Sequence, residues 1–81
     1  MKVPVKITVA LKEGILDPEA RAIRHALADL GFPTEQLSSA RLFYITVEAS
    51  DEEAAVERGR QMAERLLANP VIHRFTVEVS R

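Results

Sequence analysis

The 81-residue sequence lacks cysteine and tryptophan and contains three glycines that stand far apart. Without cysteine, disulfide scaffolds, thiolate nucleophiles and cysteine-based zinc sites are excluded. None of the glycines, at positions 14, 31 and 59, opens a glycine-rich turn between a strand and a helix, so a nucleotide-binding loop is excluded as well. No apolar run is long enough for a signal peptide or a membrane span, so we expect a cytoplasmic protein without a membrane partner.

Neither sign of charge dominates, because eleven Lys and Arg residues are balanced by twelve Asp and Glu residues and the formal net charge is −1. We therefore expect no nucleic-acid partner, since such binding needs a basic surface. His25 and His73 are isolated, with no second histidine at ligand spacing. The serines lack the turn that presents a hydrolase nucleophile. We expect no catalytic residue, no metal site and no cofactor bound by this chain.

Apolar residues make up 47% of the chain and charged residues 28%, with both signs interspersed, which is typical of a globular protein. A chain of this length is too short for a second domain, so residues 1–81 are predicted to form one domain. A domain of this size buries roughly 60 to 65% of the surface of its unfolded chain. We expect self-association to add the stability that such a thin core does not provide.

The first half of the chain predicts a strand, a helix and a connector. Apolar and polar residues alternate from residue 3 to residue 11, as in a half-buried strand. Asp17 and Pro18 form a helix start, and the helix is predicted to end at Gly31, with Phe32 placed to contact Leu27. Residues 31–36 then connect this helix to the next strand.

The second half predicts a strand, a helix and a final strand. Residues 37–49 are predicted to be extended, and the part from 37 to 40 is either a separate short strand or a bent extension. Ser50 and Glu53 form a capping box that opens a second helix, which ends at Asn69 and Pro70, and residues 71–79 alternate again. The order β-α-β-α-β predicts an α+β fold, a two-layer ferredoxin-like sandwich with both helices on one face of a mainly antiparallel sheet.

The second face of this sheet has no cover from the chain itself. By alternation it carries more apolar side chains than a face in contact with water needs. We expect a second copy to cover it, most simply in a homodimer. The residues predicted for this dimer face are Leu42, Tyr44 and Ile72.

Two segments are not explained by folding alone. The first, residues 12–16, places two large apolar residues after a charged pair and a glycine, in a loop where apolar side chains gain nothing unless they dock. The second, residues 66–72, contains Asn69 and Pro70. In structural terms, Asn69 would end the helix in the left-handed conformation, and Pro70 would prevent the helix from continuing. A contact function is compatible with it.

In these segments the sequence resembles the PurS family, the small subunit of the multi-chain phosphoribosylformylglycinamidine synthase of purine biosynthesis. The resemblance covers nearly the whole chain in order and spacing. The residues that carry it are Leu11-Lys12-Glu13-Gly14-Ile15-Leu16-Asp17-Pro18, Ala26-Leu27, Leu30-Gly31-Phe32 and Leu66-Leu67-Ala68-Asn69-Pro70-Val71-Ile72.

The resemblance implies a subunit without an active site of its own. In that family a glutaminase subunit releases ammonia from glutamine. A large synthetase subunit uses ATP and Mg²⁺ to activate the amide of formylglycinamide ribonucleotide, and ammonia then displaces phosphate to give the amidine. The small subunit, as a homodimer or higher homo-oligomer, is expected to bridge these partners and to assist ammonia transfer. The protein is thus an enzyme only as part of the complex, an ATP-dependent ligase that takes its nitrogen from glutamine.

Two other classes of protein are alternatives to this function. A free-standing dimer of the ACT type, which senses small molecules at a subunit interface, has a similar size and order of elements. A small enzyme of the acylphosphatase kind would need an arginine in the loop after the first strand and a catalytic asparagine. That loop holds no arginine here, and Asn69 is the only asparagine.

The ferredoxin-like order also predicts where the two unexplained segments lie. If the last strand runs antiparallel to the first, its start near residue 71 lies beside the end of the first strand near residue 11. The segments then form one surface at a single end of the domain, which we assign to partner docking. The residues predicted for this docking surface are Lys12, Glu13, Gly14, Ile15, Asn69 and Pro70.

Overall fold

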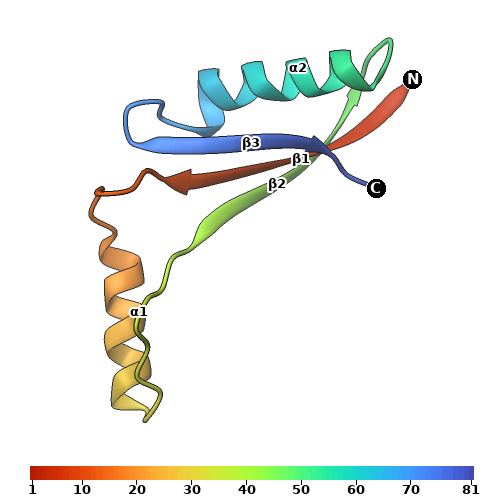
Figure 1. Ribbon diagram of the computed structural model, residues 1–81. Helices are drawn as coiled ribbons and strands as arrows, with labels where there is room; N and C mark the ends of the chain where they lie inside the picture. Colours follow the sequence, from red (N-terminus) through yellow and green to blue (C-terminus); the bar gives the residue numbers. More distant parts are fainter.

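In the computed structural model, which describes all 81 residues, three strands form one antiparallel sheet. The central strand is β1 (Lys2–Leu11), and it pairs with β2 (Ala40–Glu48) on one side and with β3 (His73–Val79) on the other (Figure 1). Helix α1 (Pro18–Asp29) follows β1, and helix α2 (Glu52–Met62) lies between β2 and β3. The predicted α+β class, element order and antiparallel sheet are confirmed.

The core lies between α2 and one face of the sheet. The alternation of β1 places Val3, Val5, Ile7 and Val9 on this face, and all four are almost completely buried. Small residues on the inner side of α2 let its backbone approach the strands closely. A Cβ atom added at Gly59 would lie 2.8 Å from Cγ1 of Val77, so only glycine fits there without rearrangement.

Helix α2 begins one residue later than its predicted cap. The sequence predicts Ser50 as the cap, but Oδ1 of Asp51 accepts the hydrogen bond from the amide of Ala54, at 2.8 Å. A carboxylate caps as well as a hydroxyl does, and its charge also interacts favourably with the positive end of the helix dipole. The negative charge therefore favours Asp51 at this position.

The end of the second helix also differs from the prediction. After Met62 the chain forms a π-helical turn, Ala63–Leu67, which closes with a hydrogen bond from the amide of Ala68 to the carbonyl of Ala63, at 2.8 Å. Asn69 does not adopt the left-handed conformation, because Gly14 and Gly31 are the residues with positive φ. The π-helical turn directs the buried Ala63 and Ala68 toward the sheet and ends the helix before Asn69.

Both ends of α1 are as predicted. Oδ1 of Asp17 accepts a hydrogen bond from the amide of Ala20, at 3.1 Å, and Pro18 occupies the first turn. At the other end the amide of Phe32 donates to the carbonyl of Leu27, at 2.8 Å, while Gly31 has a φ of 93°. These features form the Schellman end that the sequence predicts.

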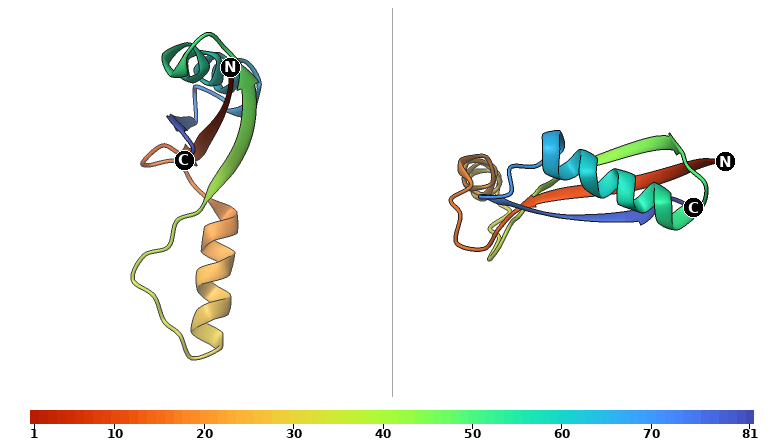
Figure 2. Two further views of the ribbon diagram at one scale, coloured as in Figure 1. Left: turned by 90° about the vertical axis from the view of Figure 1, so that its right-hand side faces the viewer. Right: turned by 90° about the horizontal axis from the view of Figure 1, so that it is seen from above.

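The position of α1 is the main departure from the predicted two-layer arrangement. Helix α2 covers the sheet, whereas α1 extends beyond the end of the strands and makes no extensive contact with them (Figures 1 and 2). The chain returns beside α1, where Nη2 of Arg24 donates to the carbonyl of Thr34 at 2.6 Å. Residues 12–39 therefore form a projecting unit, here called the arm, and the three strands with α2 and the π-helical turn form the body.

The segment from 37 to 40 lies where the arm rejoins the body. It forms no separate strand: Ala40 is the first residue of β2, and residues 37–39 continue outside the ladder.

No helix in the structure combines the length and the apolar character that crossing a membrane requires.

Candidate functional site

The two segments that folding did not explain meet at one end of the sheet. Leu11 pairs with His73 in the ladder between β1 and β3, and the amide of Lys12 donates to the carbonyl of Ile72 at 2.9 Å. The loop after β1 and the turn before β3 are thus adjacent, as the antiparallel order requires. They lie at the junction between the body and the arm (Figure 1).

The first segment is a tight, exposed turn. The amide of Ile15 donates to the carbonyl of Lys12 at 3.2 Å, and Gly14 at the third position has a φ of 82°. This conformation is typical of a type II turn, which favours glycine at that position. Lys12 and Glu13 are exposed, and Leu16 after the turn is 71% exposed.

The second segment is held by Asn69. Its side-chain Oδ1 accepts a hydrogen bond from the amide of Val71 at 3.0 Å, and its carbonyl accepts from the amides of Ile72 and His73. The amide of Asn69 donates to Nδ1 of His73 at 2.8 Å. Asn69 thus fixes the turn that presents Pro70 and Val71, with His73 as an acceptor for its backbone.

The sequence predicts no partner for His73, and the structure shows that His73 supports Asn69 instead. The signal in the sequence is the spacing of four residues between Asn69 and His73 across a turn that contains Pro70.

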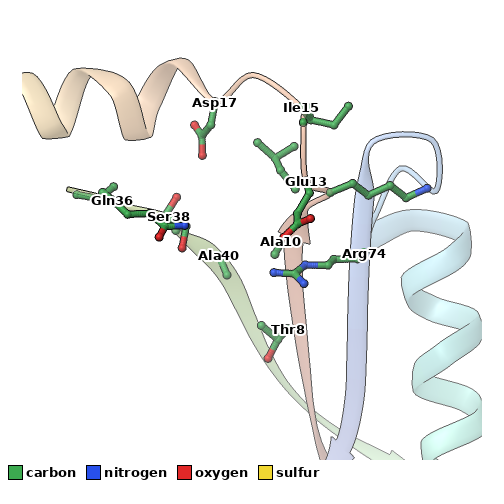
Figure 3. A pocket seen from close by; sticks show the side chains of 14 residues that line it. Thr8, Ala10, Glu13, Ile15, Asp17, Gln36, Ser38, Ala40 and Arg74 are labelled. Carbon is green, nitrogen blue, oxygen red and sulfur yellow. The ribbon is translucent and has the colours of Figure 1, made fainter. Parts of the chain in front are cut away.

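An open depression of about 700 Å³ lies between the end of the sheet and the start of the arm (Figure 3). The loop after β1 forms one wall, and residues 36–40 form the opposite wall. Figure 3 shows Glu13 and Arg74 on the side of the sheet and Asp17 and Ser38 across from them. Both signs of charge therefore line the same surface, as is common where one protein contacts another.

The side chains that line this depression make few interactions with one another. Asp17 is engaged as the cap of α1, and no hydrogen bond joins two side chains across the depression. No group of three His, Asp or Glu side chains in the structure is placed to hold a metal ion. Of the residues predicted to dock partners, four line the depression, and Asn69 and Pro70 lie on the adjoining turn.

The second predicted surface is the sheet face opposite α2. Leu42 and Tyr44 lie there and are 48% and 66% exposed, whereas Ile72 precedes β3 and is half-buried. Across the same face Nζ of Lys6 lies 3.0 Å from a carboxylate oxygen of Glu78. The hydrogen bond and the negative charge of Glu78 raise the pKa of Lys6.

Comparison with known proteins decides the family. A family profile described as PurS, phosphoribosylformylglycinamidine (FGAM) synthase, matches residues 4–81. The PurS subunit of this synthase from Methanothermobacter thermautotrophicus is 38% identical over 80 residues, which are 99% of this chain and 95% of the relative. The chain belongs to the PurS family. Proteins of this family are subunits of FGAM synthase in purine biosynthesis.

Solved PurS structures share the fold described above. PurS from Methanocaldococcus jannaschii superposes with a TM-score of 0.86 at 34% identity, covering 100% of this chain and 98% of that one. A chain in the structure of PurLQS from Thermotoga maritima gives a TM-score of 0.89 at 27% identity, covering 99% of both chains. The projecting α1 is thus part of an arrangement that closely matches solved PurS chains.

Proposed function

We propose that this chain is the non-catalytic small subunit of a phosphoribosylformylglycinamidine synthase complex. In this role it bridges the glutaminase subunit and the ATP-dependent synthetase subunit and assists ammonia transfer between them. The complex converts formylglycinamide ribonucleotide to the amidine with glutamine and ATP. ATP and Mg²⁺ are used by the synthetase subunit, and this chain supplies contacts.

The observation that carries the proposal is the match to PurS along almost the whole chain, from residue 4 to residue 81. A chain of the PurLQS structure from Thermotoga maritima has the same fold. The architecture here is consistent with an assembly role, because exposed turns and apolar side chains gather where the body meets the arm.

We assign partner docking to the turn from Lys12 to Ile15 together with Asn69 and Pro70. The turn at Gly14 and the hydrogen bonds of Asn69 hold the backbone of both segments in a fixed shape, so the backbone loses little freedom on binding. Few of these side chains contribute to the core of the body. Substitutions there are expected to change binding much more than folding.

The test is to titrate Lys12→Glu and Ile15→Ser separately against the glutaminase and synthetase subunits of the same organism. If either residue is a hot spot, affinity should fall about thirtyfold, which corresponds to about 2 kcal/mol. Lys2→Glu is the matched control, since it makes the same charge change at the far end of β1. Wild-type affinity in both docking variants would place the interface elsewhere.

The alternative, a free-standing sensor of the ACT type, would bind a small molecule without the large subunits. Calorimetry of the isolated protein with amino acids separates the two functions. We expect no binding heat, whereas saturable binding of one amino acid would favour the sensor.

We further propose that the protein acts as a homo-oligomer. The chain alone leaves large apolar side chains exposed both in the arm and on the sheet face of Leu42 and Tyr44. That sheet face remains the contact that the sequence suggests.

A further inference from the structure

One side of helix α1 carries a cluster of basic side chains. Arg21, Arg24 and His25 are three and four residues apart, so they lie on the same side of the helix. All three side chains are exposed. Leu27 and Leu30 belong to the apolar stripe on the opposite side. The helix therefore presents two chemically different surfaces, and the basic one is not needed to pack the apolar stripe.

The chain does not neutralise these basic groups itself. The structure contains five ion pairs, and none of them involves a residue of the arm. Asp17, one turn before Arg21, is engaged as the cap of α1. Asp29, one turn after His25, forms no ion pair with it. The guanidinium groups of Arg21 and Arg24 are therefore available to a negatively charged partner.

Two open concavities lie on this side of α1, and Arg21 and His25 line both of them. One, of about 280 Å³, lies between the helix and the return segment at Pro33 and Thr34. The other, of about 340 Å³, extends toward the start of the helix and Leu16. Together they form a trough along the helix, here called the α1 trough. No carboxylate lines either concavity, so the trough favours an acidic occupant.

Thr34 in the return segment holds Arg24 in place. Nε of Arg24 donates to the hydroxyl of Thr34 at 3.3 Å, and Nη2 donates to its carbonyl at 2.6 Å. A guanidinium group has five N–H donors, and these two hydrogen bonds leave the others for a further acceptor. The Arg24 side chain therefore loses little freedom when it binds a carboxylate. This lowers the entropic cost that makes most exposed ion pairs weak.

The α1 trough continues from the turn to which we assign partner docking. Leu16, which is 71% exposed, follows the turn from Lys12 to Ile15 directly and lines the near end of the trough. From Pro18 to Ala28 the helix rises about 15 Å, which is the length of about five residues of extended chain. A partner segment that contacts the turn can therefore extend along the arm (Figure 1).

We propose that the α1 trough binds an extended acidic segment of a larger subunit of the complex. Carboxylates of this segment pair with Arg21 and Arg24, because a guanidinium group can bind a carboxylate through two parallel hydrogen bonds. Leu16 adds an apolar contact at the near end of the trough. This contact extends the proposed docking surface along the arm, and it rests on the proposed function.

Charge reversal tests the ion pairs by calorimetric titration against the glutaminase and synthetase subunits separately. Arg21→Glu should weaken binding to one of them about thirtyfold or more, and Arg21→Gln should weaken it less, because reversal adds repulsion to the lost pair. The matched control adds Glu19→Arg to Arg21→Glu, which restores the net charge at a residue outside the trough. Affinity should stay low in this double variant. Recovery to the wild-type value would mean that net charge, rather than the trough, determines binding.

Carbodiimide coupling of the assembled complex identifies the segment itself. Arg21→Lys keeps the positive charge and supplies an amine, which carbodiimide joins to a carboxylate in direct contact. The wild-type chain is the control, because its guanidinium group does not couple. We expect mass spectrometry of the peptides to find a link from position 21 to an Asp or Glu of a larger subunit. A complex without any link from this position would contradict the proposed contact.

The remaining outcomes also overturn the contact. Wild-type affinity of Arg21→Glu, together with weak binding of Lys12→Glu, would exclude the trough from the interface and leave the proposed function in place. A wild-type chain that binds neither subunit would refute the proposed function itself, so the two failures are distinguishable. A link from Arg21→Lys to a second copy of this chain would assign the trough to self-association. Binding of inorganic phosphate to the isolated chain, abolished by Arg21→Gln, would assign it to a small anion.

Discussion

The body and the arm differ in how much of their structure one chain completes. Among the buried residues only Ala20 belongs to the arm, and the remainder lie in the body. The body has a core because β1 presents an unbroken apolar face and α2 offers small residues against it. The arm has a capped helix with an apolar stripe and no surface of its own chain to cover it. The helices and strands of both regions therefore follow from local sequence, but only the body is packed into a core by this chain alone.

The largest loss of stability is expected from a substitution in the centre of the body. Ile7 is completely buried in contact with the far end of α2, and Ile7→Ala should lower the free energy of unfolding by about 2 to 5 kcal/mol. Thr8→Ala, on the opposite face of the same strand, is the control and should have a much smaller effect. Chemical denaturation measures both. Equal losses for the two variants would contradict a one-sided core.

A smaller loss of stability is expected from a substitution where α2 approaches the sheet. Gly59→Ala introduces a methyl group 2.8 Å from Cγ1 of Val77. Overpacking of this kind costs about 1 to 3 kcal/mol, and better helix propensity returns about 1 kcal/mol. We expect a net loss of about 1 kcal/mol, which Val77→Ala in the same chain should partly relieve. A gain in stability from Gly59→Ala alone would show that the contact is not limiting.

The helix caps compare the two regions most closely, because Asp51 and Asp17 make the same type of hydrogen bond. Each substitution by alanine should cost its helix about 1 kcal/mol. Asp51→Ala is expected to lower the stability of the whole body, whereas Asp17→Ala should mainly reduce hydrogen-exchange protection in α1. The amides of β1 report the difference. Equal loss of protection in β1 for both variants would mean that arm and body unfold as one unit.

The sequence predicts correctly those elements that depend on signals from residues close together in the chain. Asp17 and Pro18, the glycine at position 31 and the alternation in β1 and β3 each predict a feature that the structure contains. The placement of α1 was not predictable in this way, because the same apolar stripe fits a surface of its own chain or of another. The cap at Asp51 was missed because Ser50 satisfies the same pattern one residue earlier. The π-helical turn depends on how Ala63 and Ala68 pack, and sequence periodicity does not encode that.

The sequence predicts that the two segments meet, but it does not predict the contacts that support them. The meeting of the loop at Lys12 with the turn at Asn69 follows from strand direction alone. The role of His73 depends on a hydrogen bond across a turn, and the return segment depends on Arg24 reaching Thr34. Such contacts arise from side-chain geometry that spacing in the sequence does not specify.

Reconstitution of the synthase tests the central claim most directly. The glutaminase and synthetase subunits of the same organism are assayed with the ribonucleotide and ATP, with either glutamine or ammonium chloride as the nitrogen source. We predict that the chain alone shows no turnover and that adding it restores the glutamine-dependent reaction much more than the ammonia-dependent one. Lys12→Glu, with its dimer mass unchanged, should fail to do so. Turnover by the chain alone, or equal glutamine-dependent rates with and without it, would contradict the account.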